Sequence, residues 1–220
     1  MLHRLNTLLQ ASLPMGRIEV QNLPGCPEIT LGLINADFPL GPLPPEVMQN
    51  VIERPAYWAL CWGSGQALAR HLLDHPIWVR GRSVVDLGSG SGVVAVAAAL
   101  AGARRVIACD TDPAARTATA SNAVLNGVAV EVIDNLEQVG CDHDLLLMAD
   151  VLYDRSNLPL LGQASRHARE VLVADSRRAT LPDADYHLLR EISAVTYPNL
   201  GEFDEFGTVR LFYRSANTDG

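Results

Sequence analysis

The stretch VVDLGSGSG, Val84–Gly92, decides how this sequence is expected to fold. It begins as an apolar run that leads into Asp86, and it ends in glycines at alternate positions, Gly88, Gly90 and Gly92. Glycine lets a backbone turn sharply and approach a ligand closely. In an open α/β sheet, ligands lie beyond the carboxyl ends of the strands. The stretch therefore predicts a buried strand, a ligand-binding loop and the start of a helix.

Strands and helices alternate around this loop. Apolar runs that predict strands cover residues 83–87, 105–110, 128–134, 143–150 and 170–175. Stretches that predict helices cover residues 93–103, 112–127 and 158–168. Strands that alternate with helices indicate βαβ units, and hence a parallel, doubly wound sheet of the Rossmann-like type.

The C-terminal part departs from this alternation. Residues 192–198 and 208–214 have the composition of two strands, and the connection between them is too short for a crossover helix. Two strands joined in this way pair antiparallel. We therefore expect an α/β fold with a seven-stranded sheet that is mostly parallel and carries an antiparallel C-terminal strand.

Residues 1–54 are predicted to form an N-terminal extension ahead of a main domain over residues 55–220. The first fifteen residues place their leucines on one helical face, which favours a short docking helix. A turn signal and a dense group of prolines then interrupt the chain. We expect strands over residues 17–23 and 28–34, an irregular loop over 38–45, and a helix over 62–75.

Charge and composition limit the partners and the compartment. The chain has 220 residues and a formal net charge of −8, which disfavours a nucleic-acid partner because the phosphates would be repelled. Every apolar run is much shorter than the ~20 residues of a membrane span. The four cysteines, Cys26, Cys61, Cys109 and Cys141, lie far apart and indicate reduced thiols in a cytoplasmic protein.

Acidic side chains near the strand ends indicate what the glycine loop would bind. Asp110 follows the second strand, where a carboxylate can accept hydrogen bonds from ribose hydroxyls. The free N–H groups of the helix after Gly92 favour an anionic group. Together they predict a nucleoside with an acidic tail. Asp134 and Asn135 follow the third strand near the expected adenine edge, although both also suit a solvated turn.

Two cofactor types fit the loop. The run Gly90–Ala95 satisfies the dinucleotide pattern GxGxxA, whereas Asp86, Gly88, Gly90 and Gly92 satisfy DxGxGxG, which resembles motif I of class I S-adenosylmethionine-dependent methyltransferases. A carboxylate at Asp86 would repel a pyrophosphate but attract the ammonium and sulfonium of S-adenosylmethionine. Asp86 and the antiparallel final strand favour the methyl donor, and a dinucleotide oxidoreductase stays open.

The fourth predicted strand runs into MADVLYD, residues 148–154, and places Asp150 and Tyr153 in the same crevice. An acid beside an aromatic ring can hold an amine. DVLYD resembles the DxxY motif of seven-strand protein lysine methyltransferases. PAYWALCWGSGQALARHLLDHP, residues 55–76, resembles the PYWAxYWPGGQALxRxLLDNP signature of the electron transfer flavoprotein beta subunit lysine methyltransferases, and the likeness covers roughly residues 28–154.

This resemblance implies an enzyme that uses S-adenosylmethionine to methylate a protein lysine, with the electron transfer flavoprotein beta subunit as the suspected partner. It implies that Asp150 binds and orients the lysine, that Tyr153 walls the pocket, and that Trp62 lies over the cofactor. The chain departs from the family at Gly63 and Ser64, where the signature reads Pro-Gly.

Other functions stay open at this point. The nearest alternative is a small-molecule N-methyltransferase with a nicotinamide-like acceptor, and a more distant one is a non-catalytic cofactor-binding protein. His71 and His75 have a spacing that can bind a metal, but no acid or cysteine partner is evident, so we expect exposed histidines and no metal site. The sequence leaves open the methyl acceptor, the number of methyl groups added, the oligomeric state and the role of the extension.

Overall fold

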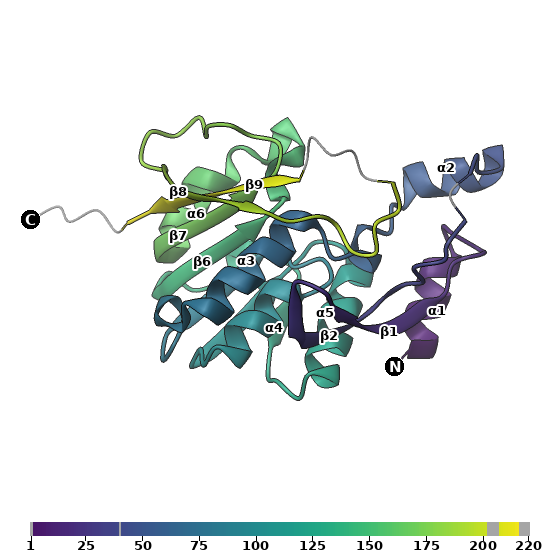
Figure 1. Ribbon diagram of the computed structural model, residues 1–220. Coiled ribbons are helices and arrows are strands. Elements are labelled where there is room, and N and C mark those ends of the chain that lie inside the picture. Colours follow the sequence, from purple (N-terminus) through teal and green to yellow (C-terminus); the bar gives the residue numbers. More distant parts are fainter. Residues whose placement is uncertain (1, 40, 202–206, 216–220) are drawn as a thin grey trace, which may run out of the picture.

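A computed structural model describes residues 2–39, 41–201 and 207–215. These residues hold a seven-stranded sheet in the order β5-β4-β3-β6-β7-β9-β8 (Figure 1). The strands are β3 (Ser83–Leu87), β4 (Arg105–Cys109), β5 (Glu131–Ile133), β6 (His143–Ala149), β7 (Ala168–Asp175), β8 (His187–Ser193) and β9 (Thr208–Arg214). The first five in this order run parallel, and β9 is antiparallel to both β7 and β8. The predicted fold class is confirmed.

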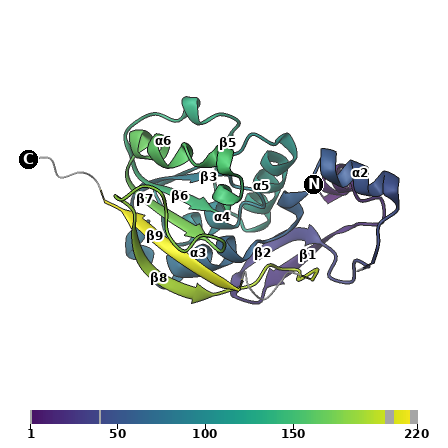
Figure 2. The ribbon, with the colours of Figure 1, turned by 90° about the horizontal axis from the view of Figure 1, so that it is seen from above.

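Helices cover both faces of the sheet. They are α3 (Gly63–Asp74), α4 (Val93–Leu100), α5 (Pro113–Leu125) and α6 (Leu160–His167). The helices α3 and α4 lie on one face and α6 lies on the other, as Figures 1 and 2 both show. Side chains of a strand point alternately to the two faces, and β3 follows this rule, with Val84 packed on one side and Val85 on the other.

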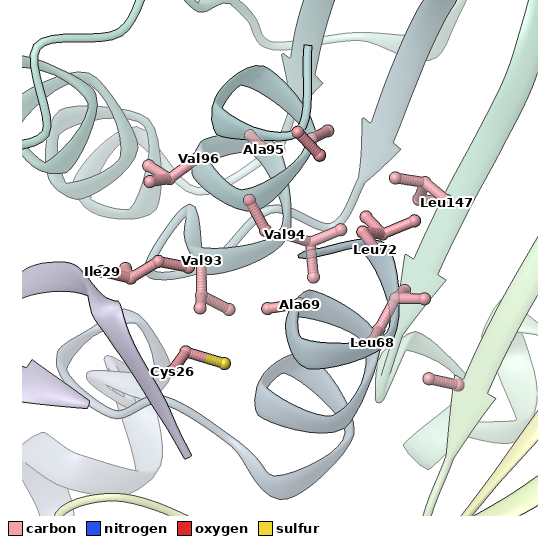
Figure 3. Packing of buried hydrophobic residues seen from close by; sticks show 14 of the residues in the cluster. Cys26, Ile29, Leu68, Ala69, Leu72, Val93, Val94, Ala95, Val96 and Leu147 are labelled. Carbon is pink, nitrogen blue, oxygen red and sulfur yellow. The ribbon is translucent and has the colours of Figure 1, made fainter. Parts of the chain in front are cut away.

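The core between α3, α4 and the sheet consists of small and branched apolar residues. Figure 3 shows Ala69 of α3 facing Val93 and Val94 of α4, Leu68 turned toward the strands, and Ile29 of the extension beside Val93. Small side chains allow two helices to approach closely, and the valines fill the remaining space. The glycine loop at the start of α4 is therefore held on a rigid support.

The N-terminal extension packs against α5. It comprises α1 (Leu2–Gln10), an antiparallel hairpin of β1 (Ile18–Leu23) and β2 (Cys26–Ile34), and α2 (Pro45–Glu53). Asn122 of α5 accepts a hydrogen bond from the Gly32 N–H at 2.8 Å, and Asn126 accepts one from the Thr30 N–H at 2.9 Å. The predicted division at residue 54 is not tested by these contacts and stays a prediction.

The expected irregular loop over residues 38–45 ends one residue earlier than predicted. Pro45 opens α2 rather than closing the loop, because proline is tolerated in the first turn of a helix, where no N–H donor is needed. The helix that follows was not predicted, since the prolines before it dominate the composition. Leu40, inside the expected loop, lies outside the described residues.

The first C-terminal strand is displaced from its predicted place. It was expected over residues 192–198, whereas β8 ends at Ser193. Beyond it, Tyr197 pairs with Cys61 in an isolated antiparallel bridge, with N–H to oxygen distances of 2.7 and 2.8 Å. The error has a physical reason, because β8 is an exposed edge strand and lacks an apolar run. The predicted antiparallel pairing with β9 is confirmed.

His71 contradicts the expectation of an exposed pair. Its ring is buried, 5.0 Å from the His75 ring and 5.7 Å from the Trp78 ring between centroids. Neither ring nitrogen of His71 has a hydrogen-bond partner among the described residues. Burial lowers the pKa of His71 to about 4, so the neutral form is preferred. Trp78 covers this face of α3, which sequence spacing cannot reveal, and only His75 is exposed.

Among the residues that the structure describes, no helix is long and apolar enough to cross a lipid bilayer.

Candidate active site

A cavity of about 970 Å³ opens at the carboxyl edge of the sheet. Parts of its wall come from the ends of β3, β4 and β6, and the segment that follows α2 closes one side. The order of the strands produces this crevice, since β3 has β4 on one side and β6 on the other and the connections leave in opposite directions. The predicted ligand-binding edge and the observed cavity therefore coincide.

The three motif glycines all have left-handed backbone angles. The φ values are +76° at Gly88, +51° at Gly90 and +79° at Gly92. Gly88 and Gly90 line the cavity. Gly92 does not, and a Cβ placed there would stand 2.9 Å from the Thr119 backbone. Gly88 and Gly90 therefore expose their backbone to the cavity, where a ligand can approach it. Gly92 instead allows α5 to pack against the loop.

Asp86 lies beneath the loop rather than in the cavity wall. Its side chain is 1% exposed, and its Oδ2 accepts a hydrogen bond from the Ala95 N–H at 3.0 Å. Burial raises the pKa of Asp86 to about 7, although the Ala95 N–H favours the charged form. The side chain fastens α4 to β3, and its predicted interaction with a cofactor stays a prediction.

Asp110 follows the last residue of β4 and lines the cavity. One carboxylate oxygen accepts from the Gly90 N–H and the other from the Asp112 N–H, both at 2.9 Å. Burial raises the pKa of Asp110 above its usual range, and these two N–H groups oppose the rise. Asp110 thus holds the glycine loop in place and presents a carboxylate edge to the cavity, where ribose hydroxyls can donate.

Asp134 and Asn135 occupy different places despite being neighbours. Asn135 lines the cavity, and its side-chain oxygen caps a short turn by accepting from the Glu137 N–H at 2.9 Å. Asp134 is exposed, lies outside the cavity wall and accepts from Gln138 at 2.6 Å. The structure therefore brings Asn135, and not Asp134, to the predicted cofactor side.

Asp150 lines the cavity directly after β6, with a left-handed φ of +53°. Its Oδ1 accepts from the Ser64 hydroxyl at 2.6 Å and from the Ser176 hydroxyl at 3.1 Å. Its Oδ2 accepts from the Ser64 N–H at 3.2 Å, at the start of α3. Burial raises the pKa of Asp150, while Ser64 favours the charged form. The carboxylate is held in one orientation by two serines.

Sequence reasoning did not identify Ser64 or Ser176 as part of the site. One signal was available for Ser64, since this residue lies in the short segment that departs from the family signature. Its hydroxyl and N–H both bind Asp150, so the departure is coupled to the predicted acceptor-binding carboxylate. Ser176 carries no comparable sequence signal, because only the pairing of β7 with β6 brings it near.

Aromatic rings line the same cavity beside Asp150. Tyr153 is half-exposed, and its ring lies edge-on to Tyr57 with centroids 5.7 Å apart. Tyr57 in turn lies 5.8 Å from Trp62, whose indole N–H donates to the Tyr57 carbonyl at 2.9 Å. Trp58 belongs to the buried core of the extension. Sequence reasoning missed Tyr57, although it stands inside the quoted signature.

The cavity thus combines two kinds of surface. The glycine loop and Asp110 suit a nucleoside, while Asp150 and the tyrosines suit a cationic amine through charge and ring faces. No group of three or more metal-ligating side chains occurs in the described part of the chain.

Comparison with known proteins identifies a family that matches the segment carrying the site motifs. Residues 67–154 match the family described as ribosomal protein L11 methyltransferase (PrmA). This segment runs from α3 to the residue after Tyr153, so it includes both the glycine loop and the Asp150 motif.

Several relatives share one description, electron transfer flavoprotein beta subunit lysine methyltransferase. The Mus musculus protein is 40% identical over 144 residues, which cover 61% of this chain and 54% of that protein. The Homo sapiens protein is 48% identical over 103 residues, which cover 44% and 38% respectively. A Caenorhabditis elegans protein, described as a homolog of that enzyme, is 30% identical over 214 residues, which cover 87% and 86%.

The alignments reach only part of the vertebrate relatives. The chain spans about half the length of the Mus musculus and Danio rerio proteins that it matches.

Solved structures agree in fold. A ribosomal protein L11 methylase from Lactobacillus delbrueckii subsp. bulgaricus has a TM-score of 0.53 and 23% identity, covering 70% of this chain and 79% of that one. A structure described as a putative RNA methyltransferase from Pyrococcus horikoshii has a TM-score of 0.54 and 16% identity, covering 71% and 83%. At these identities the likeness extends to the fold alone.

Proposed function

This chain belongs to the family of the electron transfer flavoprotein beta subunit lysine methyltransferases, and from that premise we propose that it methylates a lysine side chain of a protein. The proposed methyl donor is S-adenosylmethionine, and the suspected partner is the electron transfer flavoprotein beta subunit. The observation that carries the proposal is the shared cavity, which Asp150 and Tyr153 line together with the glycine loop and Asp110.

The cavity residues fit the proposed cofactor. Asp110 has acceptor capacity for ribose hydroxyls, and the bare backbone of Gly88 and Gly90 admits a ligand at close range. Asn135 and Trp62 line the same cavity and are proposed to contact the adenine edge and the cofactor side. S-adenosylmethionine, when bound, supplies an electrophilic methyl group on a sulfonium.

The residues on the acceptor side are proposed to prepare the lysine. A lysine amine must lose its proton before it can attack, which costs about 4 kcal/mol at pH 7.4 for an unperturbed pKa near 10.4. Exclusion of water from the lysine, once its protein covers the cavity beside Tyr57 and Tyr153, would reduce this cost by disfavouring the ammonium. Asp150 favours the ammonium instead, so we assign it to capture and orientation rather than to proton removal. Correct placement of the amine supplies most of the rate.

The serines give Asp150 a defined direction. The Ser64 hydroxyl and the Ser176 hydroxyl both donate to Oδ1, so the carboxylate cannot turn freely. An amine approaching from the cavity therefore meets an oriented acceptor beside the Tyr153 ring. Restriction of this kind is what converts an encounter into a reactive geometry.

The experiment incubates purified protein with radiolabelled S-adenosylmethionine and either electron transfer flavoprotein beta subunit or nicotinamide. The 220 residues contain no lysine, so lysine label cannot come from self-methylation within them. Label on a lysine of the beta subunit, located by mass spectrometry, is the expected result. Label on nicotinamide alone would assign the chain to small-molecule methylation. Binding of NAD without S-adenosylmethionine would favour an oxidoreductase, and binding of the methyl donor without any transfer would favour a non-catalytic protein.

A cytoplasmic location is also part of the proposal. It is supported by Cys26, Cys61 and Cys109, which are buried and take part in no disulfide. We expect an antibody against the protein to detect it in the cytoplasmic fraction of lysed cells. Recovery in an exported fraction would contradict this location.

A further inference from the structure

One helix of the extension buries none of its side chains. In α2, Met48 is 43% exposed and Ile52 is 68% exposed. The two residues are four positions apart, so they lie on the same face of the helix. By contrast, α1 buries Leu5 and Leu9 against the rest of the molecule. The apolar face of α2, defined here by Met48 and Ile52, is therefore not explained by packing within the described chain.

The position of α2 connects it to the cavity. Glu53, its last residue, lines the cavity, as does the segment that continues to Tyr57. Figures 1 and 2 show α2 standing out beside α1, away from the body of the sheet. Tyr57 is half-exposed and leads to Tyr153 at the acceptor side. In the chain, Glu53 and Arg54 lie between Tyr57 and the apolar face of α2, and both line the cavity, so α2 adjoins the cavity rim.

The size of a protein interface decides whether α2 is within reach of a docked substrate. A specific interface buries about 800 Å² on each partner, which corresponds to a disc of roughly 16 Å radius. A helix of nine residues is about 14 Å long. A lysine side chain is short, so its own protein must sit directly on the rim. A partner centred on the cavity therefore extends over α2.

Charge indicates the chemistry of that partner. Glu46 and Glu53 lie near the two ends of α2 on the side away from Met48 and Ile52, and the whole chain carries a net charge of −8. A surface that presents a lysine together with other basic residues is attracted to a chain with this net negative charge. The exposed methionine is also suited to an irregular apolar partner surface, because its side chain is flexible.

We propose that the apolar face of α2 is a docking surface for the protein substrate, and that it receives an apolar patch bordered by basic residues next to the target lysine. This inference rests on the proposed function, because it concerns the same acceptor. Exposed apolar surface beside a site is typical of a protein–protein contact. The cavity selects the lysine, and α2 selects the protein that carries it.

The test replaces Met48 and Ile52 together by arginine, which is tolerated in helices and adds no lysine. Ile77→Arg is the matched control, since Ile77 is 82% exposed in the segment that precedes β3, at the opposite edge of the sheet. Each protein is assayed on intact electron transfer flavoprotein beta subunit and on a short peptide around its methylated lysine. We expect kcat/KM of the double variant to fall at least tenfold on the intact subunit and to stay unchanged on the peptide.

The outcomes separate this inference from the proposed function. Equal activity of the double variant and the wild type on the intact subunit overturns the docking surface and leaves the function standing. Equal losses on subunit and peptide also overturn it, because they indicate a damaged site. A wild-type dimer that the double variant dissociates assigns the face to a second copy instead. No methylation of the subunit by the wild type overturns the proposed function, and the docking surface with it.

Discussion

The ends of β3 and β6 carry the same type of residue in neighbouring strands, yet the two aspartates have different surroundings. Asp86 is the penultimate residue of β3, and Asp150 follows the last residue of β6. Asp86 is enclosed beneath the loop with the Ala95 N–H as its partner. Asp150 lines the cavity and has hydroxyl partners from Ser64 and Ser176.

This difference of two positions relative to the strand end has a geometric origin. Side chains within a strand stand perpendicular to the sheet, so Asp86 points toward the layer of α4. Beyond the ladder the chain turns, and the left-handed φ of Asp150 directs its side chain into the crevice. Asp110 follows the last residue of β4 and also reaches the cavity. A strand-end acid therefore faces a ligand when it follows the strand, and supports the fold when it lies inside it.

The largest expected effect is at Asp150. Replacing it by alanine removes the only carboxylate assigned to the acceptor, and we expect methylation of the protein substrate to fall about 100-fold, as for the loss of a strong charged hydrogen bond. S-adenosylmethionine affinity, measured by calorimetry, is expected to stay within about twofold. Asp150→Asn keeps the shape and removes the charge. Full activity of the alanine variant would falsify the assignment.

The next effect concerns the cofactor side. Asp110→Ala removes the acceptor for the Gly90 N–H and for the proposed ribose hydroxyls, and we expect the Kd for S-adenosylmethionine to rise about 30-fold, equivalent to about 2 kcal/mol. Asp110→Asn, which keeps one acceptor oxygen, is expected to lose less. Calorimetry gives both values, and an unchanged Kd for the alanine variant would remove Asp110 from the cofactor site.

A smaller effect is expected from the serines behind Asp150. Ser64→Ala deletes the shorter hydroxyl contact, at 2.6 Å, and is expected to lower kcat about tenfold, whereas Ser176→Ala, with a contact of 3.1 Å, should lower it less. Losing the Ser64 hydroxyl also raises the pKa of Asp150, so the acidic limb of the pH–rate profile should move to higher pH. An unshifted profile would show that Ser64 does not act through Asp150.

The smallest effect tests Asp86 as a structural acid. Its folded pKa of about 7 lies above its ordinary value of 3.8, so the folded state gains a proton, and stability, as the pH falls from 8 toward 5. Asp86→Asn lacks this titration. We expect the free energy of unfolding in urea, taken as variant minus wild type, to be more positive at pH 8 than at pH 5. A difference that does not vary with pH would contradict this assignment.

Much of the fold follows from local patterns. The parallel strands were predicted because strands buried on both faces are continuously apolar, as in SVVDL, residues 83–87. The displaced strand β8 shows the limit of such patterns, since an exposed edge strand has no apolar run to recognise. The unpredicted helix α2 shows another, because its start is a proline that also suits a loop.

The candidate site was predictable to the extent that its residues lie in contiguous motifs. The glycine loop and DVLYD are each contained in one short stretch of chain. The order of residues within each stretch is enough to predict a turn in the first and a strand end in the second. Ser176 and Tyr57 were not predicted, because the first reaches Asp150 only through the pairing of β7 with β6, and the second reaches Tyr153 only through the path of the extension.

Local patterning of the amino acids is enough to predict the α/β class, the strand ends where a ligand binds, and the cofactor loop. Tertiary packing decides which strand-end acids are open to the cavity, as it separates Asp150 from Asp86. It also decides that His71 is buried and that α2 has no buried side chain. The physical reason is that spacing along a chain sets the direction of a side chain, whereas burial depends on segments that are distant in sequence.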